Sequence, residues 1–327
     1  MPAEASGAGP RISVVIPAFN EQDNVAELVE RVSNSVGPLG SFEIVIVDDG
    51  STDATWARIC EAAEADPQVV GIRLQRNFGQ HPAVTAGFDA SRGDIVVTLD
   101  ADLQNPPEEI PKLVERLGPD CDVASGWRYV RHDIWLRRLP SMLVNTITAK
   151  LTGVKLHDYG CMLRAYKREV IDMLARCPEV NRTITALVSW LGVSIVEVPV
   201  EHAARKYGKS RYGYWRLVRM TFDILTGFTT TLLQWVSVTG IVVSLVGLAA
   251  SVVLIVWRIL FGSGPIGITT FLSVLLFLAG IQVAAVGVVG EYIGRIYVQV
   301  QGRPYYITRE RTSESADAKD AGVRAVR

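Results

Sequence analysis

Two aspartates separated by one residue could together hold a divalent cation. Asp100 and Asp102 come directly after DIVVTL (94–99), a run of β-branched residues typical of a buried strand. Side chains at positions i and i+2 of an extended chain point the same way, so both carboxylates can converge on one hard cation. Magnesium completes such a shell with water and phosphate oxygens. The pair predicts cation-assisted chemistry on a phosphate compound, although a DxD pattern also occurs by chance in solvated loops.

A second acidic motif, DDGS (48–51), ends the apolar run IVIV (44–47) in the same way. Here Ser51 or Asp53 could cap the following helix, because short polar side chains accept hydrogen bonds from the first N–H groups of a helix. We interpret the motif as serving both purposes, helix capping and ligand binding.

Four short apolar runs predict the strands that would position these residues: 11–17, 43–48, 69–74 and 94–99. Between the first two, residues 21–36 place apolar side chains at helical spacing. This alternation is typical of a parallel sheet with helices on its faces, and ligands bind beyond the carboxyl ends of such strands. The motifs PAFNE, DDGS, RNFGQH and DAD all follow strand ends, so we expect them to form one site.

Composition and charge exclude several classes of protein. The 327 residues suffice for one catalytic domain with an additional part. With 33 Lys and Arg against 34 Asp and Glu, the net charge is −1, which excludes a nucleic-acid binder that works through bulk positive charge. The 49% hydrophobic content excludes general disorder. The mean hydropathy of +0.23 indicates a soluble part combined with a smaller membrane part.

The cysteines and the N-terminus indicate a cytoplasmic domain. Cys60, Cys121, Cys161 and Cys177 are scattered without metal-ligand spacing, and we expect reduced thiols. Residues 1–10 contain no apolar run, so we expect no cleavable signal peptide.

Two charge-free runs, 236–257 and 268–290, predict two membrane spans. At ~1.5 Å per residue the first run covers roughly 33 Å of helix, enough for a hydrocarbon core of about 30 Å. Buried core helices are the alternative, which two such runs in succession disfavour. Arginines flank the pair on both outer sides, so the positive-inside rule predicts cytoplasmic termini and a cytoplasmic catalytic domain.

The predicted organisation is a flexible N-terminus (1–10), a catalytic domain (11–211), an amphipathic juxtamembrane segment (212–234), transmembrane helices at 235–258 and 267–290, and a cytoplasmic C-terminal segment that is disordered at its end (291–327).

The segment 202–219 carries six basic residues among four aromatic ones and has no acidic residue. Basic side chains mixed with aromatic ones just outside a membrane suit the headgroup region and anionic phosphate. A simple positive-inside flank would explain Arg216 and Arg219. It would not explain the cluster from Arg205 to Arg211, for which we favour a phosphate-binding role.

Taken in order, the motifs resemble those of the family 2 glycosyltransferases of GT-A fold, in particular the polyprenyl-phosphate sugar transferases. The resemblance extends from residue 11 to about residue 306 and implies a GT-A (Rossmann-like) α/β nucleotide-sugar domain followed by a two-helix transmembrane hairpin. The matching stretches are VVIPAFNE (14–21), IVDDGSTD (46–53), RNFGQH (76–81), LDADLQNPPEEIP (99–111), DYGCMLRAY (158–166), RKYGKSRY (205–212) and GEYIGRIY (290–297).

The resemblance also implies roles for matching residues on the donor side. Uracil and ribose of a nucleotide sugar would be held by Pro17, Phe19, Glu21 and Asp49. The cation, Mg²⁺ or Mn²⁺, and the diphosphate would be bound by Asp100, Asp102 and Gln104.

On the acceptor side, the resemblance implies that Asp158 is the catalytic or acceptor-positioning carboxylate. We also predict catalytic roles for Asp102 and Arg205. A lipid phosphate is already anionic at neutral pH, so we expect Asp158 to position the acceptor rather than act as an obligatory base. The residues implied for binding that phosphate are Arg128, Arg137, Ser141, Arg205 and Arg211, the last standing where relatives often have Lys.

The sequence therefore predicts a metal-dependent, inverting glycosyltransferase. It would move a sugar from a nucleotide-sugar donor to undecaprenyl or decaprenyl phosphate at the cytoplasmic face of the inner or plasma membrane, for later use in a cell-envelope glycan. Acidic Glu21 and Asp49 are compatible with uracil, so we expect a UDP-linked donor, while these residues leave a GDP-linked donor open. Partners would be the donor, the lipid acceptor and the bilayer, with no nucleic acid. Pairing of the hairpins could give a homo-oligomer, a dimer or a tetramer.

Three alternatives remain beside this prediction. A processive polysaccharide synthase would carry a QxxRW motif, which is absent, and would need more than two spans. A non-catalytic membrane scaffold would have no reason to keep all of its acidic motifs. A dinucleotide-dependent dehydrogenase would carry GxGxxG after the first strand, and this chain does not.

The loop 181–190 differs from that of relatives that move formamido-arabinose, so the motifs leave the sugar open.

Overall fold

A computed structural model describes residues 10–128, 156–158, 160–177, 184–203, scattered positions between 236 and 260, and 268–312. The chain forms two compact units. One comprises Met1–Leu217 and Gly302–Arg327, and the other comprises Val218–Gln301.

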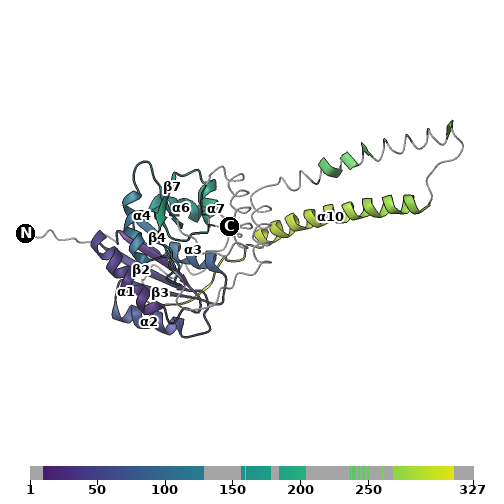
Figure 1. The fold of residues 1–327 in the computed structure, drawn as a ribbon. Helices are drawn as coiled ribbons and strands as arrows, with labels where there is room; N and C mark the ends of the chain where they lie inside the picture. The colour runs from purple at the N-terminus through teal and green to yellow at the C-terminus, as the bar shows by residue number, and fades with distance from the viewer. Residues whose placement is uncertain are drawn as a thin grey trace, which may run out of the picture. The chain divides into compact units, whose positions relative to one another are not determined.

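The first unit is built on one eight-stranded mixed sheet with the order β7-β5-β6-β4-β1-β2-β3-β8 (Figure 1). The four strands predicted from the sequence are confirmed. They pair in parallel, β1 with β2 and β4, and β2 with β3. The strands are β1 (Ile12–Ala18), β2 (Phe42–Asp48), β3 (Val69–Leu74), β4 (Ile95–Thr98), β5 (Val123–Arg128), β6 (Arg164–Lys167), β7 (Ile195–Val200) and β8 (Thr308–Arg311).

Helices cover both faces of this sheet, because β1 is apolar on both sides. Val14 and Ile16 belong to the core that also contains buried residues of α1. Val15 points to the other face, where a Cβ added at Gly87 of α3 would lie 2.2 Å from the Val15 Cγ1 atom. Glycine therefore allows α3 to pack directly on β1. The described helices of this unit are α1 (Val25–Val36), α2 (Thr55–Ala65), α3 (Gln80–Ala90), α4 (Ile110–Arg116), α6 (Arg168–Arg176) and α7 (Ile184–Trp190), with 3₁₀ turns η1 (Gly37–Leu39) and η2 (Pro107–Glu109).

The strands beyond β4 bring later parts of the chain to the edge predicted for the site. β6 runs antiparallel to β4, with Thr98 opposite Arg164, so the residues before β6 lie beside the loop that follows β4. β5 is antiparallel to β6 and parallel to β7, and its last residue, Arg128, pairs with Val200. The carboxyl ends of β5 and β7 therefore share this edge.

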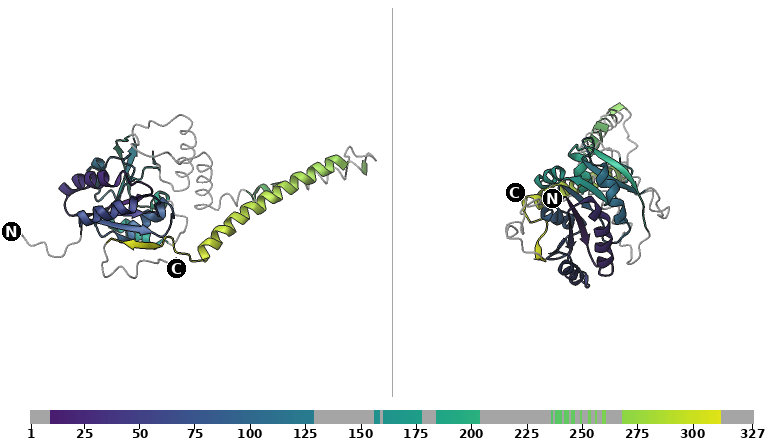
Figure 2. Two further views of the ribbon diagram at one scale, coloured as in Figure 1. Left: turned by 90° about the horizontal axis from the view of Figure 1, so that it is seen from below. Right: turned by 90° about the vertical axis from the view of Figure 1, so that its left-hand side faces the viewer.

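The C-terminal segment adds β8 as an antiparallel strand along β3, shown in yellow at the sheet edge in Figure 2. The Trp56 indole N–H donates to Glu310 Oε2 at 3.0 Å. The buried Tyr306 hydroxyl donates to Asp89 Oδ2 of α3 at 2.8 Å. The sequence predicted only a cytoplasmic segment here, and residues 313–327 lie outside the described part.

The second unit contains α10 (Ile268–Val300), on which large apolar side chains such as Phe271, Val286 and Ile293 are exposed. Among the residues described, no helix combines the length and hydrophobicity needed to cross a bilayer. The predicted hairpin is therefore not shown. Much of the expected first span (235–258) and all of 212–234 lie outside the described residues.

Candidate active site

The loops that follow β1 and β2 are held together by hydrogen bonds between side chains and backbone. The Ser51 hydroxyl accepts from Asn20 N, and Asn20 Oδ1 accepts from Thr52 N, both at 2.9 Å. Asn20 has a φ of 56°, a left-handed conformation that asparagine tolerates better than most residues. The predicted donor-binding residues Phe19 and Glu21 flank Asn20, so these bonds fix their backbone relative to the DDGS loop.

Other residues predicted to bind the donor also lie at this edge of the sheet. Pro17 lies in β1 opposite Val47 of β2. Glu21 begins the turn that leads into α1: its backbone N–H donates to Thr55 Oγ1 at 2.9 Å, and its carboxylate accepts from Asn24 Nδ2 at 2.5 Å. The turn explains why α1 begins at Val25, four residues later than predicted.

Asp49 connects the β2 end to the loop after β3. Its two carboxylate oxygens accept the backbone N–H groups of Phe78 at 2.7 Å and Gly79 at 2.9 Å. Burial raises the pKa of Asp49 to about 6, because removing a carboxylate from water disfavours its charge, although these two N–H groups act in the opposite direction. The adjacent Gly50 has a φ of +67°, and a Cβ there would lie 2.5 Å from the Arg76 carbonyl carbon. Only glycine fits this close approach.

The DxD loop supplies oxygen ligands of the kind that magnesium and manganese prefer. Asp100 and Asp102 are both half-buried. Asp100 Oδ1 accepts from Gln80 Nε2 at 2.7 Å, and Asp102 Oδ1 accepts from Gln104 N at 3.2 Å across Leu103, whose φ is 57°. Two carboxylates and an amide fit a hard cation that keeps water or phosphate ligands. Within the described ranges there is no group of three or more His, Cys, Asp and Glu residues suited to a fully protein-bound metal.

The chain after β7 reaches the DxD loop. The backbone N–H of Ala203 donates to the Gln104 carbonyl oxygen at 2.8 Å. The basic cluster begins two residues later with Arg205. Four predicted site residues, Arg137, Ser141, Arg205 and Arg211, lie outside the described residues.

Asp158 and Arg128 form a bidentate ion pair. The guanidinium Nε and Nη2 atoms lie 2.6 and 3.0 Å from the two carboxylate oxygens. Asp158 is buried, whereas 21% of the Arg128 side chain is exposed. The sequence analysis gave these residues separate roles, Asp158 in catalysis or acceptor positioning and Arg128 in phosphate binding, but the structure joins them in one ion pair. Asp158 therefore orients a guanidinium that lies partly open to solvent.

Glu197 of β7 holds the backbone around Asp158, a contact that sequence reasoning missed. Its Oε1 accepts from His157 N at 2.7 Å and from Asp158 N at 3.3 Å, and its Oε2 lies 2.7 Å from His157 Nδ1. The His157 ring stacks on Trp127 with centroids 4.6 Å apart. No recognisable motif surrounds Glu197, and it lies about forty residues from His157 and Asp158 in the sequence, so only the folded structure reveals this contact.

Two further titratable groups near the edge, His81 and Cys161, are poorly suited to acid–base or nucleophilic chemistry. Burial, followed by the nearby Arg164 charge, lowers the pKa of His81 to about 4, so its imidazole is neutral at pH 7. Burial raises the pKa of the Cys161 thiol to about 11. All four cysteines are free thiols, as the sequence predicted.

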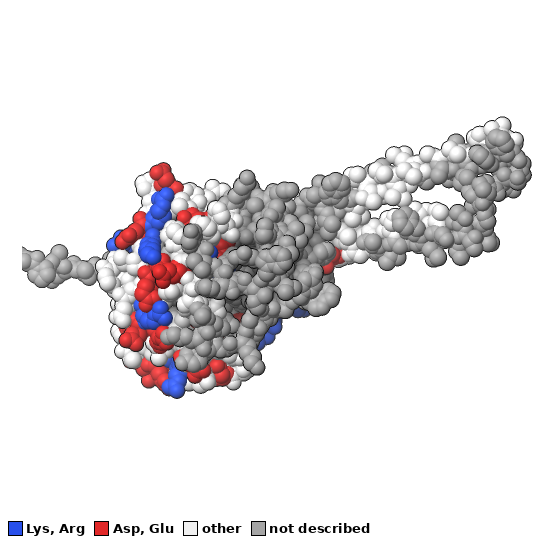
Figure 3. Space-filling view, viewed as in Figure 1, with Lys and Arg blue, Asp and Glu red and all other residues white. Residues whose placement is uncertain are grey.

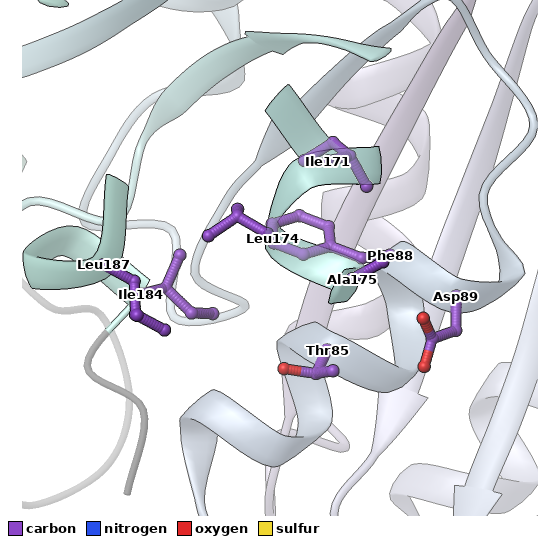
Figure 4. A pocket seen from close by; sticks show the side chains of 8 residues that line it. All are labelled: Thr85, Phe88, Asp89, Ile171, Leu174, Ala175, Ile184 and Leu187. Carbon is purple, nitrogen blue, oxygen red and sulfur yellow. The ribbon is translucent and has the colours of Figure 1, made fainter. Parts of the chain in front are cut away.

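A separate hollow lies along the second half of α3, facing α6 and α7 (Figure 4). The Phe88 ring lies beside Ile171 and Leu174, and most of the lining is aliphatic or aromatic. Its acidic residue, Asp89, already accepts from Tyr306. The hollow lacks converging polar groups, and we place the candidate active site at the strand ends instead.

Charges of both signs alternate on the described surface of the first unit (Figure 3). Arg31, for example, pairs with Glu27 and Glu108, and Arg58 pairs with Glu61. The described surface visible in Figure 3 therefore has mixed charge rather than one dominant sign.

Comparison with known proteins adds the following. A family model described as Glycosyl transferase family 2 matches residues 13–174. The chain is 43% identical over 304 residues to an undecaprenyl-phosphate 4-deoxy-4-formamido-L-arabinose transferase of Enterobacter sp. (strain 638), covering 91% of this chain and 93% of the relative. A protein of the same description from Edwardsiella ictaluri is 44% identical, with 90% and 92% covered.

Among solved structures, the fold is similar to that of glucosyl-3-phosphoglycerate synthase from Mycobacterium tuberculosis in complex with Mg²⁺ and uridine diphosphate. The TM-score is 0.50 at 21% identity, over 67% of this chain and 78% of that one. This likeness supports the GT-A fold of the first unit.

Proposed function

The chain belongs to glycosyl transferase family 2, and we propose that it transfers a sugar from a UDP-linked donor to a polyprenyl phosphate. One observation carries the proposal: similarity to relatives named as undecaprenyl-phosphate sugar transferases extends over nine-tenths of both chains. The arrangement at the strand ends supports the same chemistry, because it combines oxygen ligands for a cation with a partly exposed guanidinium.

In the proposed reaction, an oxygen of the lipid phosphate attacks the anomeric carbon of the sugar. The bond from that carbon to the donor's diphosphate breaks, and the nucleoside diphosphate leaves with the bonding electrons. In-line attack inverts the anomeric configuration. A cation bound by Asp100, Asp102 and Gln104 would offset the negative charge that grows on the leaving diphosphate.

The chain's own residues divide the remaining work. Glu21 and Asp49 border the pocket proposed for uridine, and Asp49 also fixes the loop that ends at Gly79. Arg128 would bind the anionic lipid phosphate through its guanidinium, which Asp158 holds in place and which is partly exposed. Because that phosphate is already ionised at neutral pH, Asp158 has no proton to remove and serves to orient Arg128.

We place this reaction at the cytoplasmic membrane face, with residues 235–258 and 267–290 as the anchoring hairpin. The charge-free runs and the exposed apolar side chains of α10 support this placement, since large exposed apolar surfaces mark contacts with lipid or protein. A reporter fused after Arg327 should remain cytoplasmic, and alkaline carbonate should leave the protein in the membrane fraction. An external reporter, or release by carbonate, would contradict the placement.

The activity test uses purified full-length protein in detergent with undecaprenyl phosphate, Mg²⁺ or Mn²⁺, and a panel of UDP- and GDP-sugars. We expect nucleotide release that requires both the lipid phosphate and the cation. Asp102→Asn should abolish release, whereas Asp172→Asn on the exposed side of α6 should not change it. Release that persists in EDTA would remove the cation from the proposal, and release without lipid phosphate would remove the acceptor.

A further inference from the structure

Gln80, the first residue of α3, contacts the proposed cation site directly. Its carboxamide donates from Nε2 to Asp100 Oδ1 at 2.7 Å. The sequence places Gln80 within RNFGQH (76–81), after the third strand, but gives this side chain no task of its own. In the structure it joins the loop after β3 to the loop after β4.

The position of Gln80 is itself fixed from β2. Asp49 accepts the N–H groups of Phe78 and Gly79, the two residues that precede Gln80. Gly79 has a φ of +105°, which lets the chain turn sharply into α3. A continuous series of contacts therefore runs from Asp49 at the proposed uridine pocket to Asp100 at the proposed cation site.

We propose that Gln80 is a positioning residue of the cation site, an inference that rests on the proposed function. A carboxylate on a loop can rotate about its χ angles, and a short hydrogen bond to one oxygen restricts that rotation. Outer partners of this kind orient metal ligands, and their loss typically weakens metal binding. A neutral amide suits the task, because a lysine or arginine in its place would compete with the cation for the carboxylate.

The test measures cation binding directly as well as activity. Full-length protein in detergent with saturating UDP is titrated with Mn²⁺, and free Mn²⁺ is followed by electron paramagnetic resonance. Gln80→Leu removes the amide, and Gln80→Asn keeps an amide on a side chain too short to reach Asp100. Gln75→Leu is the matched control, because Gln75 is exposed on the same loop.

We expect both Gln80 variants to raise the Mn²⁺ dissociation constant by about 10- to 100-fold. Gln75→Leu should leave this constant unchanged. At saturating Mn²⁺ the turnover of Gln80→Leu should recover most of the wild-type value, so the defect lies in cation affinity rather than in the chemical step. UDP binding measured without cation should match that of the wild type.

Unchanged Mn²⁺ affinity in Gln80→Leu would overturn the inference while leaving the proposed function intact. A defect of equal size in Gln75→Leu would also overturn it, because the effect would then belong to the loop in general. If the wild type binds no Mn²⁺ in the presence of UDP, the cation part of the proposed function fails together with the inference. If it binds Mn²⁺ but uses no lipid phosphate, only the acceptor assignment fails.

Discussion

Replacing Asp158 by Asn separates a role in holding Arg128 from a role in moving a proton. The Asp158 carboxylate is 1% exposed and accepts two bonds from the guanidinium, at 2.6 and 3.0 Å. Asparagine keeps the shape of the side chain but loses its charge. One of its two amide positions then presents N–H groups to the N–H groups of Arg128, so one of the two bonds is lost and the other is weakened.

The expected cost follows from the burial of the pair. Removing one partner of a buried ion pair costs about 3–5 kcal/mol. Because 21% of the Arg128 side chain is exposed, water recovers part of this loss. We therefore expect Asp158→Asn to lower the free energy of unfolding by about 2–4 kcal/mol. Asp122→Asn is the control: Asp122 pairs with Lys167 at 2.7 Å near the surface, both side chains are about 30% exposed, and breaking an ion pair of this kind costs about 1 kcal/mol or less.

The kinetic assay compares Asp158→Asn, Arg128→Gln and the double variant. If Asp158 acts through Arg128, each single variant raises the KM for lipid phosphate by about tenfold, and the double variant is no worse than either. The kcat and its pH dependence should change little. Unfolding followed by tryptophan fluorescence supplies the stability values for the same three proteins.

Two results would refute this reasoning. One is a loss in kcat of about 10²-fold or more in Asp158→Asn while Arg128→Gln keeps its kcat, which is the pattern of a general base. The other is additivity of the two single variants in the KM for lipid phosphate, which would mean that the two side chains act independently.

The remaining predictions concern three single residues, Asp49, Gly50 and Tyr306. Protonation of Asp49 weakens its hydrogen bonds with the 78–79 N–H groups, so kcat/KM should fall as pH drops through about 6. The pH profile of Asp49→Asn should lack this fall. Because the pKa of Asp49 is raised, its charge opposes folding above about pH 6, and its contribution to stability should improve as pH falls toward 4; thermal unfolding of both proteins across that range measures this. Gly50→Ala should cost about 1–3 kcal/mol and weaken UDP binding by calorimetry, because its Cβ would lie 2.5 Å from the Arg76 carbonyl carbon; normal binding would contradict this. Tyr306→Phe should lower the free energy of unfolding by about 1–2 kcal/mol with near-normal turnover, since it removes the donor that the buried Tyr306 hydroxyl supplies to half-buried Asp89; an unchanged denaturation midpoint would argue against it.

The parallel half of the sheet could be predicted because each of its strands has a local apolar sequence pattern. Residues 44–47 are buried on both faces and are β-branched without interruption, and a polar motif follows at once. The site motifs at the ends of β1, β2 and β4 then followed from the rule for parallel sheets. What the sequence could not show was which of these residues touch, since Asp49 reaches across to the 78–79 backbone and not to its own helix.

Strands β6 and β8 could not be predicted from the sequence, for physical reasons. β6 is only four residues long, and two of its buried residues, Arg164 and Tyr166, carry polar groups that mask the apolar pattern. β8 reads TRER, and its place in the sheet depends on pairing with β3 more than two hundred residues away. Such strands are defined by their pairing partners rather than by their own side chains. The Asp158–Arg128 pair likewise depends on the long-range pairing of β5 with β6.

The acidic residues at the strand ends differ in burial and in the groups that they contact. Buried Asp158 pairs with the full charge of Arg128, whereas burial raises the pKa of Asp49 by more than its two backbone N–H donors lower it. Asp100 accepts from the neutral Gln80 amide and Asp102 accepts from a backbone N–H, and both are less buried than Asp49 and Asp158. These surroundings fit the proposed division of roles, in which the DxD pair binds the cation, Asp158 orients Arg128 and Asp49 holds the 78–79 backbone.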